Sequence, residues 1–292
     1  MLSLPFYANV GFMKTSSPIS RRRQTALRLR PVVALAVAAV LGGCAMNPPE
    51  KYAASDLETD VSLTLTKSAA ASRARGDLVA AATLYRHAHA AGPENIAPLI
   101  GLGQVLLASG APRDAAEALR KALVIDPNDA TALRGLGNAM VAIDQPELAI
   151  GHFDRALVLT PKEPRLFNGL GVANDLLGRH EEAQKLYRSG LSYTANNAAL
   201  LTNLGLSLTF SGDFDAGIDV LRELAIAPQA TPHHRQNLAL ALGLAGRGQD
   251  AAKIARADLD DRSVRANLAF YANLRALPDS IQRVRAIHVR KH

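Results

Sequence analysis

The chain has 292 residues, of which 48% are hydrophobic but only 4% aromatic, and it contains no Trp. This composition, rich in Ala and Leu, favours close-packed helices and disfavours a β-sandwich. The formal net charge is +7, but residues 1–43 contain six basic residues and no acidic one, which leaves about +1 for the rest. The basic charge therefore belongs to the leader and does not indicate nucleic-acid binding, and the sequence has no RNA-binding signature.

Residues 1–43 have the three parts of a signal peptide of the lipoprotein type. A basic segment at 21–30 precedes an apolar stretch at 31–41, which is too short to span a bilayer comfortably. The sequence Leu-Gly-Gly-Cys at 41–44 then resembles the bacterial lipobox. The resemblance implies cleavage before Cys44, a diacylglycerol on its thiol and an N-acyl chain on the new amino terminus. An ordinary signal peptide with an incidental Cys, or an uncleaved anchor helix, is the alternative.

Cys44 is the only Cys of the chain, so no internal disulfide can form. Two or three acyl chains, at about 0.8 kcal/mol per buried CH₂, anchor a protein almost irreversibly. Ala45 follows Cys44, whereas lipoproteins kept at the inner membrane of many Gram-negative bacteria carry Asp there. By this resemblance we expect a lipid-anchored protein on the periplasmic face of the outer membrane. The polar, Pro-containing segment 44–61 is predicted to be the lipidated N-terminus and a flexible tether.

A period of 34 residues governs the next two hundred residues. A small turn residue recurs at Gly76, Gly110, Asp144, Gly178, Gly212 and Gly246. Five residues after each turn the chain carries Ala81, Ala115, Ala149, Ala183, Gly217 and Ala251. Seven residues before each turn it carries Ala69, Gly103, Gly137, Gly171, Gly205 and Ala239. A fixed period in this range predicts a solenoid of stacked helical pairs, in which each pair buries its apolar face only against its neighbours.

Each unit resembles the tetratricopeptide repeat. The third unit has the pair Leu136-Gly137 on its first helix, and Ala149, Phe153 and a closing Pro161 on its second. The small residues lie where the two helices cross, because a bulky side chain would hold the helices apart, and the Pro prevents the second helix from continuing. We therefore predict an all-α, superhelical tetratricopeptide-repeat solenoid over residues 62–260. Its six predicted units are 62–95, 96–129, 130–163, 164–197, 198–231 and 232–260.

Residues 261–292 depart from the repeat. Apolar residues recur there at three- and four-residue spacing, at Val264, Leu268, Tyr271 and Leu274. This spacing predicts an amphipathic helix, which ends at Pro278. We interpret it as a capping helix that covers the end of the array, followed by a basic tail. Contact of the tail with an acidic partner or anionic lipid is the alternative.

No group of residues has the spacing of a catalytic or metal site. His87 and His89 are two apart and point in different directions on a helix, and His233 and His234 are adjacent, so zinc spacing is absent. The sequence Gly-Leu-Gly at 169–171 belongs to the repeat and is no dinucleotide motif. We expect a protein that is not an enzyme and that has no metal, no cofactor other than the lipid on its Cys, no small-molecule substrate and no nucleic-acid partner.

The surface that remains is the concave groove of the solenoid. In tetratricopeptide arrays, positions two, five, nine and twelve of each first helix line this groove, since they share one helical face. Amide and Arg side chains at these positions suit hydrogen bonding to an extended or helical segment of a partner protein. The predicted groove consists of Gln104, Arg134, Asn138, Arg165, Asn168, Asp175, Thr202 and Gln236. The alternative is that these are merely hydrated residues of the solenoid surface.

The sequence Asn-Leu-Ala-Phe-Tyr-Ala-Asn-Leu-Arg at 267–275, after the repeats, resembles a segment of the TadD-like tetratricopeptide-repeat lipoproteins of tight-adherence (Flp) pilus assembly. With the lipobox, tether and repeats, this resemblance implies a periplasmic scaffold for the pilus secretion machine. Its expected partner is the outer-membrane secretin or another pilus-assembly component. The rival interpretation is a lipid-anchored regulator of peptidoglycan-synthesising or wall-processing enzymes, and a third is a general assembly factor for outer-membrane proteins.

Overall fold

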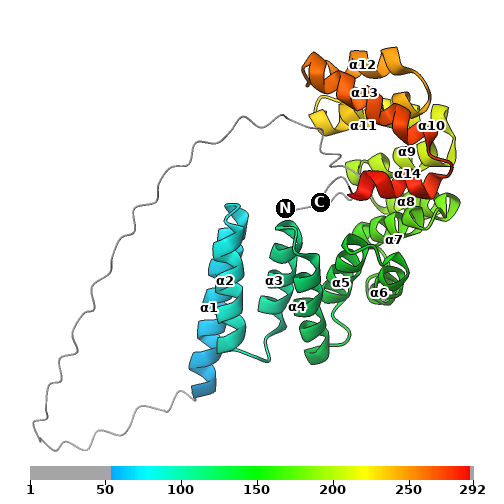
Figure 1. Cartoon of the computed structure of the whole chain (residues 1–292). Coiled ribbons are helices and arrows are strands. Elements are labelled where there is room, and N and C mark those ends of the chain that lie inside the picture. The colour runs from blue at the N-terminus through cyan, green and yellow to red at the C-terminus, as the bar shows by residue number, and fades with distance from the viewer. Residues whose placement is uncertain (1–53, 290–292) are drawn as a thin grey trace, which may run out of the picture.

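The computed structural model describes residues 54–289, and every regular element in this range is an α-helix (Figure 1). The predicted signal peptide and Cys44 lie outside the described residues, so these predictions stay predictions. The helices are α1 (Ala54–Ala74), α2 (Leu78–Ala91), α3 (Ile96–Ala108), α4 (Pro112–Ile125), α5 (Ala130–Ala142), α6 (Pro146–Leu159), α7 (Pro164–Leu176), α8 (His180–Tyr193), α9 (Ala198–Ser211), α10 (Phe214–Ile226), α11 (Pro232–Leu244), α12 (Gly248–Ala255), α13 (Asp261–Ala276) and α14 (Ser280–Val289).

The first twelve helices form six consecutive pairs, each with a first helix (A) and a second helix (B). Every A helix contacts its own B helix, the B helix of the preceding pair and the A helices of the flanking pairs. Within the described range no B helix contacts another B helix. The A helices therefore pack more closely than the B helices, and the array curves into the superhelix seen in Figure 1. This architecture confirms the predicted all-α superhelical solenoid.

The glycine columns have two structural roles. In the turn column, Gly110 has φ +76, in the left-handed region that glycine enters without strain, and Asp144 takes the same conformation with φ 59. In the crossing column, a Cβ added at Gly137 would lie only 2.6 Å from Cε1 of Phe153. A Cβ added at Gly169 on the next A helix would lie 2.5 Å from Cζ of the same ring. The ring of Phe153 is thus held between two A helices.

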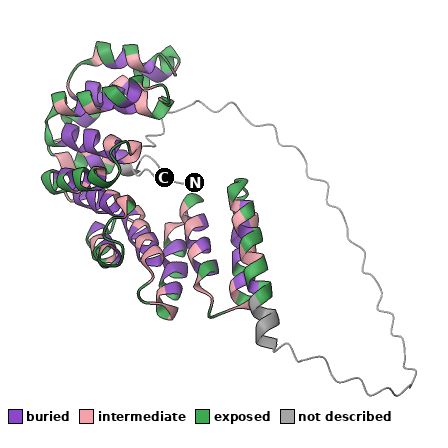
Figure 2. Ribbon diagram, turned by 180° about the vertical axis from the view of Figure 1, so that it is seen from behind, coloured by how far each residue is buried: buried purple, intermediate pink, exposed green. Residues whose placement is uncertain are grey.

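Large residues on the B helices repeat this arrangement and form one core along the array. Tyr85, Leu119, Phe153, Tyr187 and Leu221 are 34 residues apart, and none has more than 3% of its surface exposed. Figure 2 shows buried residues along the facing sides of consecutive helices. Because the core is a chain of such contacts, the stability of the protein is largely a sum over neighbouring pairs.

The two ends of the array differ from their predicted form. Helix α1 begins at Ala54, so the segment predicted as tether up to residue 61 is helical in its last part. Helix α13 packs on α11 and α12 and is the predicted capping helix. The segment interpreted as a basic tail contains α14, which returns to contact α7 and α9.

In the part of the chain that the structure covers, no helix combines the length and the apolar character needed to cross a bilayer.

Candidate protein-binding groove

Five predicted groove residues share one open stretch of the concave face. They lie on α3, α5 and the first turns of α7, and we call this stretch the open half. Their side chains are half-buried or, for the fourth of them, exposed: Gln104, Arg134, Asn138, Arg165 and Asn168. Their backbones are fixed by the apolar residues between them, such as Leu133 and Leu136, which are at most 2% exposed. The open half therefore presents polar side chains on a rigid surface.

The electrostatic feature of the open half is Arg134. Burial lowers the pKa of its guanidinium, the charge of Arg165 lowers it further, and Glu163 and Asp129 oppose these effects. An arginine stays charged under such shifts. Its guanidinium has no hydrogen bond or ion pair with another described residue. The ion pair of Arg165 with Glu163 is weak, because Nε and Oε1 are 3.8 Å apart and both side chains are partly exposed. Two adjacent, weakly compensated guanidinium groups favour a carboxylate or a row of backbone carbonyls.

The amides of the open half have hydrogen-bonding groups to spare. Asn168 accepts a 2.8 Å bond at Oδ1 from Nδ2 of Asn203, which leaves its own amide NH₂ available. Gln104 accepts a bond at Oε1 from Arg73, and its NH₂ is likewise available. An amide whose carbonyl is already held points its donors in a fixed direction. The open half is therefore arranged mainly to donate hydrogen bonds.

Asp175, Thr202 and Gln236 were predicted to line the groove, and the structure contradicts this. Their exposed fractions are 0%, 1% and 3%. Gln236 donates from Nε2 to Asp258 at 3.5 Å, beside the ion pair between Asp258 and Arg235, and so lies against the loop after α12. Thr202 is on α9, which α7, α11 and α14 enclose. These three residues have no access to a partner.

Asp175 instead forms the centre of a buried polar cluster that joins α7, α8 and α9. Its Oδ1 accepts from His180 Nδ1 and Ser207 Oγ, both at 2.7 Å, and its Oδ2 accepts from Tyr187 Oη at 2.8 Å. Burial raises the pKa of Asp175, whereas the hydrogen bonds from His180, Ser207 and Tyr187 lower it. The sequence contained no signal for this cluster, because its members come from three helices and occupy different positions of the repeat.

The cluster contains Ser, His and Asp, but these residues are not arranged so that the Ser could act as a nucleophile. The hydroxyl of Ser207 donates to Asp175 and not to an imidazole nitrogen, and Ser207 and His180 are 0% and 6% exposed. A nucleophilic serine needs its base within hydrogen-bonding reach and access to substrate. The cluster therefore links the fourth and fifth units. No group of three or more His, Cys, Asp or Glu in the described residues is placed to hold a metal.

Beyond the open half, groove position nine changes character. It carries Gln104 and Asn138 on α3 and α5, but Val172 and Leu206 on α7 and α9, both at most 1% exposed. Helix α14 contacts these same two helices. We call the concave side of α9 and the end of α7, which α14 covers, the filled half. Groove position nine thus carries half-buried polar side chains in the open half and buried apolar side chains on α7 and α9, the helices that α14 contacts.

Comparison with known proteins agrees with this fold. Tetratricopeptide repeat models match residues 72–120, 100–164 and 141–199. Similar solved structures include pilF of Pseudomonas aeruginosa, with 18% identity, a TM-score of 0.58 and coverage of 73% of this chain and 99% of that one. A tetratricopeptide repeat protein from Parabacteroides merdae has 14% identity, a TM-score of 0.56 and coverage of 79% and 99%.

A third similar structure is the tetratricopeptide repeat protein TTC0263 of Thermus thermophilus, with 19% identity, a TM-score of 0.56 and coverage of 62% of this chain and 98% of that one. At these identities the likeness shows the fold alone. No curated protein is significantly similar in sequence. The repeats and the fold define the class: the repeat models match residues 72–199, and the fold is a tetratricopeptide-repeat solenoid, an architecture typical of scaffolds for protein–protein interaction.

Proposed function

We propose that this protein is a lipid-anchored scaffold at the periplasmic face of the outer membrane, and that its open half holds a segment of an assembly partner. The single observation that carries the proposal is the set of half-buried donors at Gln104, Arg134 and Asn168, whose hydrogen-bonding capacity the described chain leaves unused. Unused donors on a rigid surface bind a partner with little loss of side-chain entropy. The partner segment therefore supplies carboxylates or backbone carbonyls.

The proposed partner is the secretin subunit, or another component, of the Flp/Tad pilus machine. The support is the lipobox at 41–44 and the resemblance of residues 267–275 to the pilus-assembly lipoproteins. In the structure, 267–275 belongs to α13, where Tyr271 and Leu274 are 1% exposed and pack the end of the array. The resembling segment thus has a structural role at the end of the array, and we propose the groove as the place where the partner binds.

The proposed mechanism is local concentration. Acyl chains on Cys44 fix the protein to the membrane, and the groove holds the partner segment within reach of the same surface. Binding at a membrane-tethered site raises the effective concentration of the partner there, without any new contact. No cofactor or chemical step is required.

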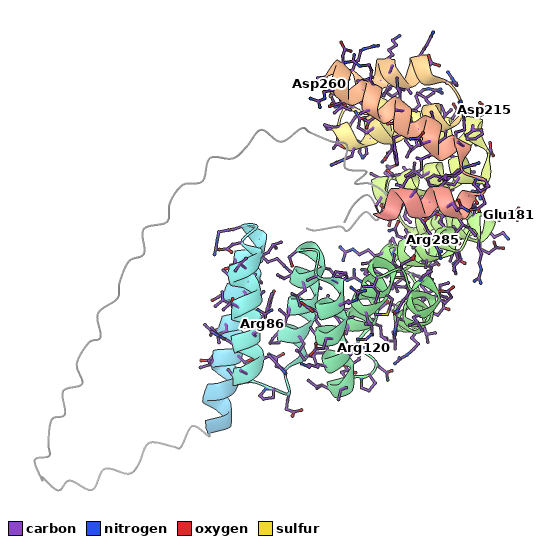
Figure 3. All side chains as sticks on the ribbon, in the orientation of Figure 1. Arg86, Arg120, Glu181, Asp215, Asp260 and Arg285 are labelled. Carbon is purple, nitrogen blue, oxygen red and sulfur yellow. The ribbon has the colours of Figure 1, made fainter. Side chains whose placement is uncertain are left out.

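Replacing Arg134 and Asn168 together by Ala is expected to weaken capture of the purified secretin subunit by about 10- to 100-fold. A hydrogen bond to a charged group contributes about 1.5–3 kcal/mol, which corresponds to this range. Both side chains are half-exposed, so helicity measured by circular dichroism should not change. Arg120→Ala is the control, because Arg120 lies on the B helix α4 and is exposed (Figure 3). Equal loss in both variants, or in neither, would place the binding site outside the open half.

Replacing Cys44 by Ala is expected to move the protein from the membrane fraction to the soluble fraction and to reduce surface pili. The reason is that the substitution removes the only thiol to which the lipid attaches. Cell fractionation and electron microscopy measure the two effects, and mass spectrometry of the wild type should find an acylated Cys44 as its first residue. An unmodified thiol in the exported protein contradicts the anchor. Normal pili in a deletion strain with defective cell-wall crosslinking would favour the wall-enzyme regulator.

A further inference from the structure

Helix α14 covers the filled half with one apolar face. Val284 and Ile287 are 0% and 1% exposed, Ile281 is half-buried, and the three are spaced three residues apart. Gln282 and Arg285 on the opposite side are exposed. Apart from the neighbouring α13, the helices that it contacts are the A helices α7 and α9, and its side chains also reach the turns after α5 and α7. Helix α14 therefore lies across α7 and α9 on the side away from the B helices, which is the concave side.

Few polar contacts tie α14 to the repeats, and its attachment there is mainly apolar. Ile281 packs in the space left by the missing side chain of Gly178, where an added Cβ would lie 2.6 Å from its Cγ1. Nε of Arg285, which Figure 3 labels, lies 3.9 Å from Oδ1 of Asp144, and both side chains are about half exposed. An exposed ion pair at this distance contributes little. Pro278 separates α14 from α13, so the two do not form one continuous helix.

The length of α14 makes it dependent on its attachment. It has 10 residues, whereas isolated helices shorter than about 12–15 residues are marginal in water. Its connection to α13 keeps it close to the groove and raises its effective concentration there. A segment held mainly in this way is displaced by a ligand that makes the same contacts with more area.

We propose that the filled half is a binding site for an amphipathic helix of the partner protein, and that this helix replaces α14 over α7 and α9. The chemistry of the partner helix follows from α14 itself. It carries apolar residues at positions corresponding to Ile281, Val284 and Ile287, and a basic residue at the position of Arg285, which faces Asp144. Helix α7 carries residues of the open half in its first turns and is contacted by α14, so one partner segment extends over both halves. This inference rests on the proposed function for the existence of a protein partner.

The probe for this site is a synthetic, fluorescently labelled peptide with the sequence of residues 279–292. In the full-length protein, Val284→Asp with Ile287→Asp removes the apolar face of α14 and opens the site. We expect the opened variant to bind the peptide at least about tenfold more tightly than the wild type, since its own helix no longer competes. Gln282→Asp, on the exposed side of the same helix, is the matched control and should bind like the wild type. A peptide with the same two Asp residues should not bind.

Equal binding by the opened variant and the wild type, or no binding by an opened variant that keeps its helicity, would overturn the proposal. Hydrogen exchange of the wild type gives a second test that does not depend on folding of the variant. The amides of α14 should exchange at least about 100-fold faster than those of α7 and α9, because α14 opens locally. Exchange of α14 only through global unfolding would make it a permanent part of the fold.

The mass of the wild type in solution tests whether the filled half is instead occupied by α14 of a second copy of the chain. A dimer in which α14 is exchanged between two copies would overturn the proposal, since the site would then be filled by a second chain. All these measurements use purified protein and a peptide. If they fail while Arg134 and Asn168 still capture a pilus component, the inference about α14 is wrong and the proposed function stands. If they succeed but no pilus component is captured, the α14 site stands and the proposed partner is wrong.

Discussion

Replacing Asp175 by Ala should lower the free energy of unfolding by about 3–5 kcal/mol, the cost of breaking a buried hydrogen-bonded network by removing one member. The substitution removes the acceptor shared by three donors on α8 and α9 and leaves Nδ1 of the buried His180 without its partner. The midpoint of thermal unfolding should fall by on the order of 10 °C. Calorimetry or circular dichroism measures this shift.

The matched control is Asp219→Ala. Asp219 is exposed and forms an ion pair with Arg222 at 2.5 Å within the same helix. Exposed pairs of this kind contribute less than about 1 kcal/mol. Asp175→Ala and Asp219→Ala remove the same atoms, so the difference between them measures the buried cluster. Similar small losses in both would mean that the cluster does not stabilise the junction of the fourth and fifth units.

The same cluster predicts a pH dependence. Burial raises the pKa of Asp175 above the ordinary value of 3.8, so the folded protein holds this proton to a higher pH than the unfolded chain does. The corresponding stabilisation is present below about pH 3.8 and is lost as the pH rises through the raised pKa. The Asn side chain of the Asp175→Asn variant does not titrate, so the stability of this variant does not show the same loss as the pH rises. The unfolding free energy of the wild type should therefore fall relative to that of the Asn variant as the pH rises, as measured by urea titrations from pH 3 upward.

Replacing Gly137 by Ala should lower the free energy of unfolding by about 1–3 kcal/mol, toward the upper end. The new methyl group would lie 2.6 Å from Cε1 of Phe153, whose ring is fully buried. The ring has no room to shift away, because Gly169 closes its other side. Either the α5–α6 pair moves apart or the next unit is displaced.

The control is the same substitution at Gly151. This glycine lies on the exposed side of α6, and a Cβ there meets no atom within 4 Å. Replacing glycine by Ala inside an exposed helix stabilises by about 0.5–1 kcal/mol. One methyl group should therefore have opposite effects at two positions 14 residues apart. Denaturant unfolding curves test this, and a change of the same sign at both sites would disprove the crowding at Phe153.

The repeat pattern predicted most of the fold because the relevant contacts are local. A turn glycine, a crossing glycine and the large residue that fills the space between helices all lie within one or two units of each other. Asp144 illustrates the strength of the pattern, since it adopts the positive φ of the glycines in its column. For the same reason, the half-buried places of Arg134 and Asn138 on α5 follow from their position in the repeat.

The rest depended on contacts that no local pattern contains. Helix α14 has a short apolar pattern among basic residues, and it contacts α7 and α9, which lie about a hundred residues earlier in sequence. Asp175 has the repeat position of a groove residue, but His180 and Ser207 hold it inside. Gln236 is held by Asp258 in a loop outside the regular repeat. A position rule assumes that all units are equivalent, and these units are not.

The missing contacts between B helices have a mechanical consequence. Each joint between units is closed on the inner side, where A helices meet, and open on the outer side. Bending that changes the spacing of the outer helices breaks no contact between one described B helix and another, and one hydrogen bond there, from Arg155 to the carbonyl of Pro127, links neighbouring units. A force along the array is therefore shared among many small rotations at the joints. A solenoid of this kind therefore changes its curvature more easily than it separates its units.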